Sequence, residues 1–123
     1  MTKLVLKRVY EPPAASDGTR ILVDRLWPRG LSKEKAHVDL WLKEIAPSDA
    51  LRRRFHGKPQ DWEEFCVSYR KELASPAGQA AAKTLREKID KGPVTLLYAA
   101  RDEEHNNAVA LQMLLTLQGG RKS

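Results

Sequence analysis

The chain has 123 residues and a formal net charge of +6, and 41% of it is hydrophobic and 31% charged. This length allows one hydrophobic core and is too short for two ordinary domains, and the composition excludes a disordered chain. The sequence has no signal-peptide segment at its start, and no apolar run approaches the roughly 20 residues of a membrane helix. We therefore expect a cytoplasmic protein with no membrane partner.

The first third of the chain predicts two strands joined by a short connection. Leu4 to Tyr10 is apolar enough for a mostly buried strand, which Pro12 and Pro13 stop. Ile21, Leu22 and Val23 are consecutive, as in a strand buried on both faces of an α/β sheet. The connection is short for a parallel crossover. An antiparallel pair and an unusually tight crossover both remain open.

The middle of the chain predicts short elements followed by two longer helices. Residues 32–35 fit one helical turn, and the alternating pattern at 38–42 favours a short strand, with a helix as the alternative. Ser48 is expected to cap a short helix that carries Leu51 and Phe55 on one face. A second helix starts in a capping box of Asp61 and Glu64 and reaches about residue 74. A third starts at residues 75–76 and ends before 92–93.

The last third predicts another buried strand, Val94 to Ala100, and a final apolar helix capped by Asp102. That helix is expected to lie in the core or at a subunit contact. The predicted fold class is α/β, a Rossmann-like three-layer domain with a small, mostly parallel sheet of about four strands flanked by helices. Residues 1–118 form this single domain, and residues 119–123 are expected to be a flexible tail.

Polar side chains follow both buried strands at the point where each strand ends. If the strands are parallel neighbours, these groups share one crevice, at the edge where open α/β sheets bind ligands. In this crevice we assign anion binding to three arginines and catalytic roles to Asp24 and His105, with Asp24 orienting an arginine and His105 carrying a proton. The candidate ligand-binding residues are Arg25, Trp27, Arg29, Arg101, Asp102 and Asn106.

Three structural interpretations compete with this site. Asp24, Arg25, Arg101 and Glu103 are equally consistent with a buried ion-pair network that ties the strand ends together. Trp27 is better explained as a packing lid than as a stacking platform, because large aromatic side chains mainly supply packing contacts. His105 is better explained as a solvated or capping histidine than as a general base.

Other kinds of chemistry find less support in the sequence. His37 and His56 lack ligand spacing, and Cys66 lies on the apolar face of its helix, so we expect no metal site and no cysteine nucleophile. No glycine-rich dinucleotide motif or phosphate-binding loop is present, and we expect no cofactor. The basic run at residues 52–54 raises nucleic-acid binding as an alternative, although a solvated helix surface explains it better.

Four segments of the chain resemble the YeaO-like proteins, a bacterial family of unknown function. They are GTRILVDRLWPRGLSKE at 18–34, WLKEIAPS at 41–48, WEEF with YRKEL within 62–73, and VTLLYAARDEEHNNA at 94–108. The resemblance implies a small cytoplasmic α/β domain and carries over no reaction or catalytic residue. Related domains have a cysteine in the final strand region, where this chain has Tyr98 and Ala99.

The sequence therefore predicts a domain that binds a small anionic metabolite at the ends of its strands. Whether it also acts on that metabolite is left open. The alternatives are a nucleic-acid-binding or regulatory protein and a dimeric interaction protein with a purely structural charged cluster, so both a monomer and a homodimer are considered.

Overall fold

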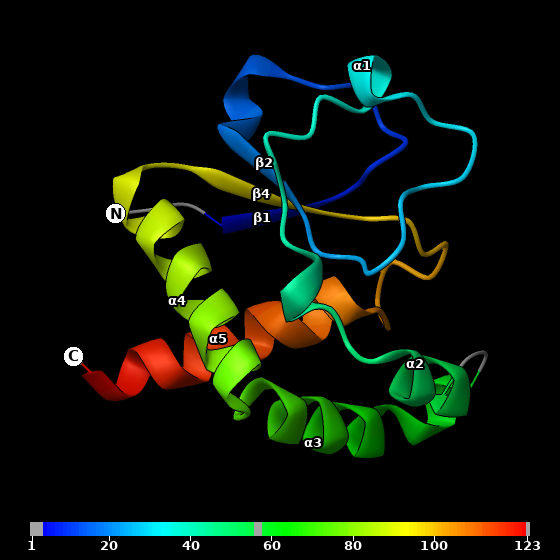
Figure 1. The fold of residues 1–123 in the computed structure, drawn as a ribbon, viewed down its shortest axis with the longest axis vertical. Coiled ribbons are helices and arrows are strands. Elements are labelled where there is room, and N and C mark those ends of the chain that lie inside the picture. Colours follow the sequence, from blue (N-terminus) through cyan, green and yellow to red (C-terminus); the bar gives the residue numbers. More distant parts are fainter. Residues whose placement is uncertain (1–3, 56–57, 123) are drawn as a thin grey trace.

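The computed structural model describes residues 4–55 and 58–122, and the chain folds around a parallel sheet of four strands (Figure 1). These strands are β1 (Leu4–Arg8), β2 (Thr19–Leu22), β3 (Leu40–Trp41) and β4 (Val94–Tyr98). Their order in the sheet is β1-β4-β2-β3, and every neighbouring pair is parallel. All five residues of β4 are buried, as its mostly apolar sequence predicts, and Thr95 is the polar one among them. The predicted α/β fold is confirmed.

The short connection between β1 and β2 proves to be a tight crossover. β4 lies between these two strands and is parallel to both, which excludes the antiparallel alternative. The connection contains one 3-10 turn, Ala15–Asp17, and then Gly18 in the left-handed region at φ 65°. A Cβ atom on Gly18 would lie 2.3 Å from the carbonyl oxygen of Pro93, so this crossing requires a glycine.

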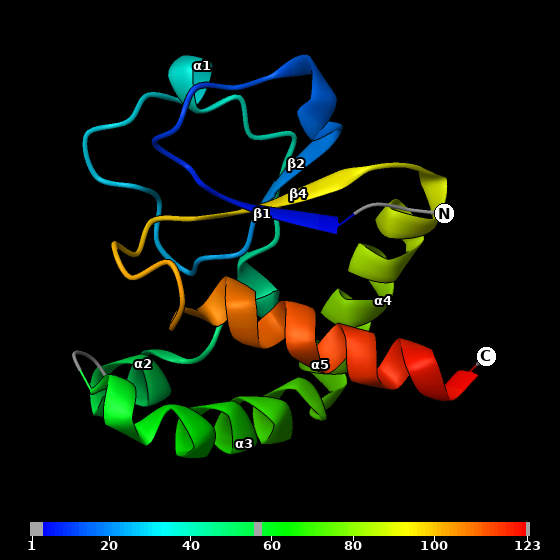
Figure 2. The same ribbon diagram turned by 180° about the vertical axis from the view of Figure 1, so that it is seen from behind.

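The two faces of the sheet are covered differently. Three helices, α3 (Trp62–Leu73), α4 (Pro76–Lys91) and α5 (Asn107–Lys122), cover one face (Figure 2). Their core includes the fully buried Tyr69, Leu85 and Leu111. The other face carries the segment between β2 and β3, whose only helix is the single turn α1 (Lys33–Ala36). The third layer is thus mostly a packed loop.

Three of the predicted helix starts are confirmed, and the caps predicted for α3 and α5 are wrong. Ser32 caps α1, Ser48 accepts the Leu51 amide at the start of α2 (Asp49–Phe55), and Ser75 accepts the Gly78 amide at the start of α4. The capping box predicted for α3 does not form. Asp61 makes no side-chain cap bond, because a 3-10 turn, Pro59–Asp61, leads directly into the helix.

The chain ends in α5, which continues to Lys122. The sequence predicts a flexible tail from residue 119, and the flexibility itself stays a prediction. Buried Ala110 and Leu111 place the first half of α5 in the core. Within the described residues, no helix is both long enough and apolar enough to span a membrane.

Candidate functional site

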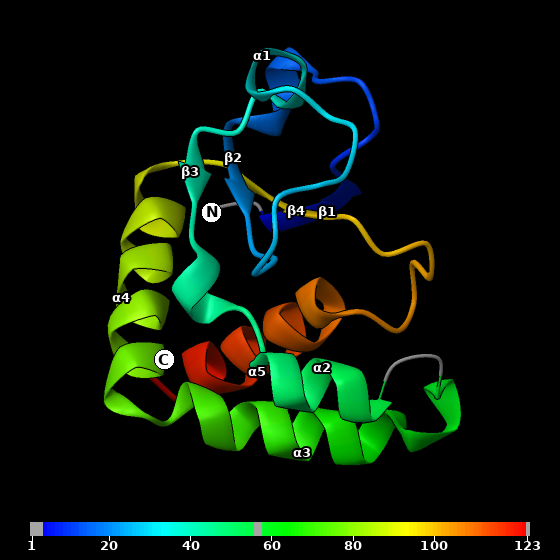
Figure 3. The ribbon, with the colours of Figure 1, turned by 45° about the vertical axis from the view of Figure 1, so that its right-hand side comes forward.

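A cleft of about 820 Å³ lies beyond the carboxyl ends of β2 and β4. The two strands are parallel neighbours, as the site prediction requires, and Figure 3 shows the chain leaving both on the same side of the sheet. The volume falls within the range of about 300–1,000 Å³ typical of small-molecule sites. All eight predicted site residues line this cleft: Asp24, Arg25, Trp27, Arg29, Arg101, Asp102, His105 and Asn106.

Asp24 joins the ends of the two strands. Its carboxylate accepts a hydrogen bond from the Ala99 amide at 2.9 Å and one from the side-chain amide of Asn107 at 3.0 Å. Burial raises the pKa of Asp24, and the bonds from Asn107 and Ala99 oppose that rise. Among the described residues these two amide donors bond to the Asp24 carboxylate, and no arginine does, so its orienting role stays a prediction.

Arg25 is held by the backbone and not by an acid. Its Nε donates to the Pro47 carbonyl at 3.2 Å and its Nη2 to the Ala46 carbonyl at 3.3 Å. A guanidinium carries five N–H donors, so several remain for a ligand. The half-buried side chain is fixed in place before any ligand arrives, which lowers the entropy cost of binding.

Arg29 and Arg101 line the cleft as exposed cations. Neither guanidinium forms a hydrogen bond or ion pair with the part of the chain that the structure describes. The ion-pair network of Asp24, Arg25, Arg101 and Glu103 is therefore not formed among the described residues. Arg8, which the sequence did not suggest, holds the end of β4 through the Ala99 and Ala100 carbonyls.

The loop before α5 is organised by Asp102. One carboxylate oxygen accepts the backbone amides of Glu104 and His105, at 2.9 and 3.0 Å, and the other lies 3.1 Å from Nδ1 of His105. These amide bonds, first that of Glu104, lower the pKa of Asp102. The helix cap predicted for Asp102 is wrong. Asn106 caps α5 instead, accepting the Val109 amide at 2.9 Å, and the helix begins at residue 107.

Trp27 is half-buried at the edge of the cleft. Its ring meets Trp41 edge to face at 5.4 Å between centroids, and its indole N–H donates to the Leu31 carbonyl at 2.6 Å. These contacts agree with a packing role for the ring, while its place in the lining leaves a stacking role open.

The sequence missed the residues that α2, α3 and the end of β1 bring to the cleft. The helical spacing of Trp62 and Phe65 predicts only a core face, yet both rings also line the cleft and stack on each other at 5.6 Å. Asn107 was missed because it follows Asn106 in a segment expected to be helix interior. The further lining residues absent from the predicted site are Tyr10, Leu26, Pro28, Ala46, Pro47, Arg52, Phe55, Lys58, Ala99 and Ala100.

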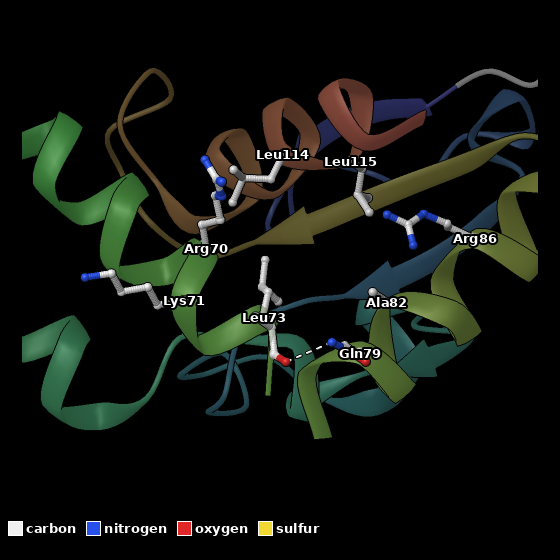
Figure 4. A pocket seen from close by; sticks show the side chains of 9 residues that line it. Arg70, Lys71, Leu73, Gln79, Ala82, Arg86, Leu114 and Leu115 are labelled. Carbon is white, nitrogen blue, oxygen red and sulfur yellow. Dashed lines mark hydrogen bonds between the residues drawn. The ribbon is translucent and has the colours of Figure 1, made fainter. Parts of the chain in front are cut away.

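A second hollow, of about 600 Å³, lies among α3, α4 and α5 and shares no residue with the cleft (Figure 4). Arg70, Lys71 and Arg86 surround apolar side chains that include Leu73 and Leu114. None of its residues belongs to the site predicted from the sequence. Among the described residues, no group of three or more histidine, cysteine, aspartate or glutamate side chains is arranged to hold a metal ion.

Comparison with known proteins places the chain in a family. Residues 3–122 match the family described as the inactive DUF488-N3 subclade. The chain is 48% identical over 105 residues to the uncharacterized protein YeaO of Escherichia coli K12, covering 85% of this chain and 90% of that protein. It is 38% identical over 114 residues to an uncharacterized protein of Mycobacterium bovis, covering 93% and 94%. No solved structure matches significantly. The chain therefore belongs to the inactive DUF488-N3 subclade and to the YeaO-like family of bacterial proteins.

Proposed function

We propose that the protein binds a small anionic molecule in the cleft beyond β2 and β4. The observation that carries this proposal is the unequal pairing of the charges that line the cleft. Its two carboxylates, Asp24 and Asp102, are both occupied by amide donors of the protein. The cations Arg29 and Arg101 are unpaired within the described residues. A ligand therefore meets free positive charge and satisfied negative charge.

Arg25 gives the anion a fixed partner. Its guanidinium plane is held by two backbone carbonyls, and a planar guanidinium suits the bidentate geometry of carboxylate and phosphate groups. Arg29 and Arg101, on the segments after β2 and β4, add charge to the lining of the cleft. Both segments are needed to complete the binding site.

Binding is favoured over catalysis. Asp24 is the better-buried acid of the cleft, but its carboxylate already accepts two hydrogen bonds that attach the end of β4 and the start of α5 to the end of β2, so moving its proton would disturb the fold. The description of the matching family as inactive supports the same choice. His105 stays the candidate proton carrier if a reaction exists.

Thermal unfolding with an added anion tests the proposal. With inorganic phosphate or citrate as probe, a specific ligand at 100 times its Kd stabilises by about 2.7 kcal/mol, which raises the melting temperature by several degrees. Arg101→Ala removes a side chain without protein partners and should abolish most of that rise. Arg53→Ala is the matched control, since Arg53 is an exposed cation on α2 outside the cleft lining.

Two outcomes would count against anion binding in the cleft. The first is that neither probe stabilises the wild-type protein. The second is that the probe raises the melting temperatures of Arg101→Ala and Arg53→Ala equally. Isothermal titration with the same variants separates a lost affinity from a lowered intrinsic stability. The same titration can be applied to Arg25→Ala. This variant loses two hydrogen bonds to backbone carbonyls, so its melting temperature is expected to fall even without a ligand.

Nucleic-acid binding is the weaker candidate. Arg52, Arg53 and Arg54 are all exposed on α2, but Arg52 pairs with Asp49 at 3.1 Å and Arg54 lies over the Phe55 ring. The three arginine side chains therefore point in different directions around a short helix and do not form one continuous binding surface. Retention on a nucleic-acid column that falls steeply with salt would favour this alternative.

A further inference from the structure

We propose that the anion bound in this cleft carries a planar aromatic group, as an aromatic carboxylate or a nucleoside monophosphate does. This inference rests on the proposed function and adds the chemical class of the ligand. It follows from the apolar and aromatic residues of the cleft lining, which an inorganic anion or a small aliphatic acid would leave unused.

Aromatic side chains are concentrated at this site. The chain has three tryptophans, three tyrosines and two phenylalanines. Five of these rings line the cleft: Tyr10, Trp27, Phe55, Trp62 and Phe65. They come from the end of β1, the segment after β2, and helices α2 and α3, so no single amphipathic helix accounts for their meeting. Ligand sites are typically walled by such side chains, with a few polar groups that fix orientation.

The rim of the cleft exposes apolar surface to solvent. Leu26 is 57% exposed and Tyr10 is 42% exposed, although both are large and hydrophobic enough to favour burial. An apolar group entering the cleft would remove part of this surface from water, at about 25 cal/mol for each Å² buried.

The tryptophan rings of the wall are held rigidly before binding. Trp27 has its N–H bonded to Leu31 and its ring against Trp41, while Trp62 stacks on Phe65 with an interplanar angle of 19° and meets His105 edge-on. Fixed rings favour planar partners, because offset stacking and edge-to-face contacts add about 0.5–1.5 kcal/mol beyond area burial. A flexible aliphatic chain gains less from such a wall.

The arginines and the rings act on different parts of one ligand. Arg25 and Arg101 follow the ends of β2 and β4, and Phe55 and Trp62 belong to α2 and α3. The volume of about 820 Å³ accommodates a ring system together with its anionic group. The cleft therefore offers cations and aromatic rings to the same ligand.

Isothermal titration with matched pairs of anions tests the inference. Adenosine 5′-monophosphate is compared with ribose 5-phosphate, which lacks the base, and 2-naphthoate with its saturated analogue decahydro-2-naphthoate. We expect the aromatic member of at least one pair to bind at least tenfold more tightly than its partner. The pair that shows the difference distinguishes a phosphate ligand from a carboxylate ligand.

Variants locate the preference in the wall. Trp62→Leu should reduce the aromatic advantage at least fivefold and leave the non-aromatic member nearly unchanged. Val67→Ala, an exposed position on the same helix outside the cleft lining, is the control and should change neither. Leu26→Ala removes exposed rim surface with little risk to folding, and it should weaken the aromatic anion at least twofold.

The outcomes separate the two proposals. If both members of each pair bind equally, and Arg101→Ala weakens them, anion binding stands and the aromatic ligand class is wrong. If no anion of either pair binds, both proposals fail. An aromatic advantage that survives both Trp62→Leu and Leu26→Ala would also overturn the assignment to this wall.

Discussion

The side-chain amide of Asn107 donates a hydrogen bond to the Asp24 carboxylate at 3.0 Å, joining residues 83 positions apart in the chain. The same amide nitrogen donates to the Val23 carbonyl at 2.9 Å. Through these two bonds the first turn of α5 is attached to the end of β2, and the Ala99 amide attaches the end of β4 to the same carboxylate. One acid therefore sets the distance between the two segments that carry the cleft arginines.

Replacing Asp24 by alanine should lower the free energy of unfolding by about 2 to 3 kcal/mol, because the Ala99 amide and the Asn107 side chain lose their acceptor. Asn107→Ala should cost about 1 to 2 kcal/mol. Urea unfolding of both single variants and the double variant gives the coupling between them, expected to be at least about 0.5 kcal/mol. Asp90→Ala, an exposed acid on α4, should change stability by less than about 0.5 kcal/mol. Additive effects would show that the bond does not join the two segments.

Asp17, Lys7 and Arg20 form a charge cluster at the start of β2. We expect this cluster to control how the stability of the fold changes in acid. Asp17 accepts hydrogen bonds from Lys7, Arg20 and the Ala14 amide. Burial alone would raise the pKa of Asp17, but these bonds outweigh it and lower the pKa. A lowered pKa in the folded state contributes stability above the unfolded value of about 3.8, and that stability is lost as pH falls through the folded pKa.

The free energy of unfolding of Asp17→Asn should therefore decrease less than that of the wild-type protein as the pH falls below 5. Urea unfolding at each pH, down to the lowest pH at which the protein is folded, measures this. Asp17→Ala should cost about 3 kcal/mol at pH 7, because it leaves Arg20, whose side chain is 5% exposed, without its acid. Asp49→Asn breaks an exposed pair with Arg52 and serves as control. An identical pH profile for Asp17→Asn and the wild-type protein would contradict the assignment.

The sequence predicts the cleft better than the contacts inside it. Runs such as 21–23 and 94–98 reveal strands buried on both faces, and parallel strands bring the charges that follow them to one edge. The sequence does not reveal which atoms form hydrogen bonds with one another inside the cleft. Arg25 is a long cation beside an acid in sequence, and only the tertiary structure places the Ala46 and Pro47 carbonyls within its reach.

The aromatic wall escaped prediction for a related reason. A ring at helical spacing indicates a core face, and Trp62 and Phe65 do contact the core. Whether part of such a ring also faces a cavity depends on how α3 lies against the segments after β2 and β4, which no local pattern encodes. The start of α5 was misplaced because Asp102 and Asn106 are both good cap residues, and Asp102 satisfies loop amides instead.

The tight crossover between β1 and β2 should depend on Gly18. Gly18→Ala introduces a Cβ atom 2.3 Å from the Pro93 carbonyl at a φ of 65°, so the chain must shift at the edge between β2 and β4. We expect a loss of at least about 2 kcal/mol in the free energy of unfolding from the combined clash and backbone strain. Gly92→Ala, near Pro93 but with open space around its added Cβ, is the matched control and should cost much less. Equal costs for the two variants would mean that the crossover tolerates a side chain.

The contact between Asp102 and His105 should fix the tautomer of the imidazole. A neutral histidine whose Nδ1 carries the proton can donate to the carboxylate 3.1 Å away, and its Nε2 is then the unprotonated nitrogen. Nitrogen-15 NMR at neutral pH should show His105 as the Nδ1–H form, whereas Asp102→Ala should shift the ring toward the Nε2–H form. His37, which has no side-chain partner among the described residues, is the internal control and should be unaffected. An Nε2–H tautomer in the wild-type protein would remove the basis for assigning His105 a defined acceptor, and with it the remaining case for proton transfer in the cleft.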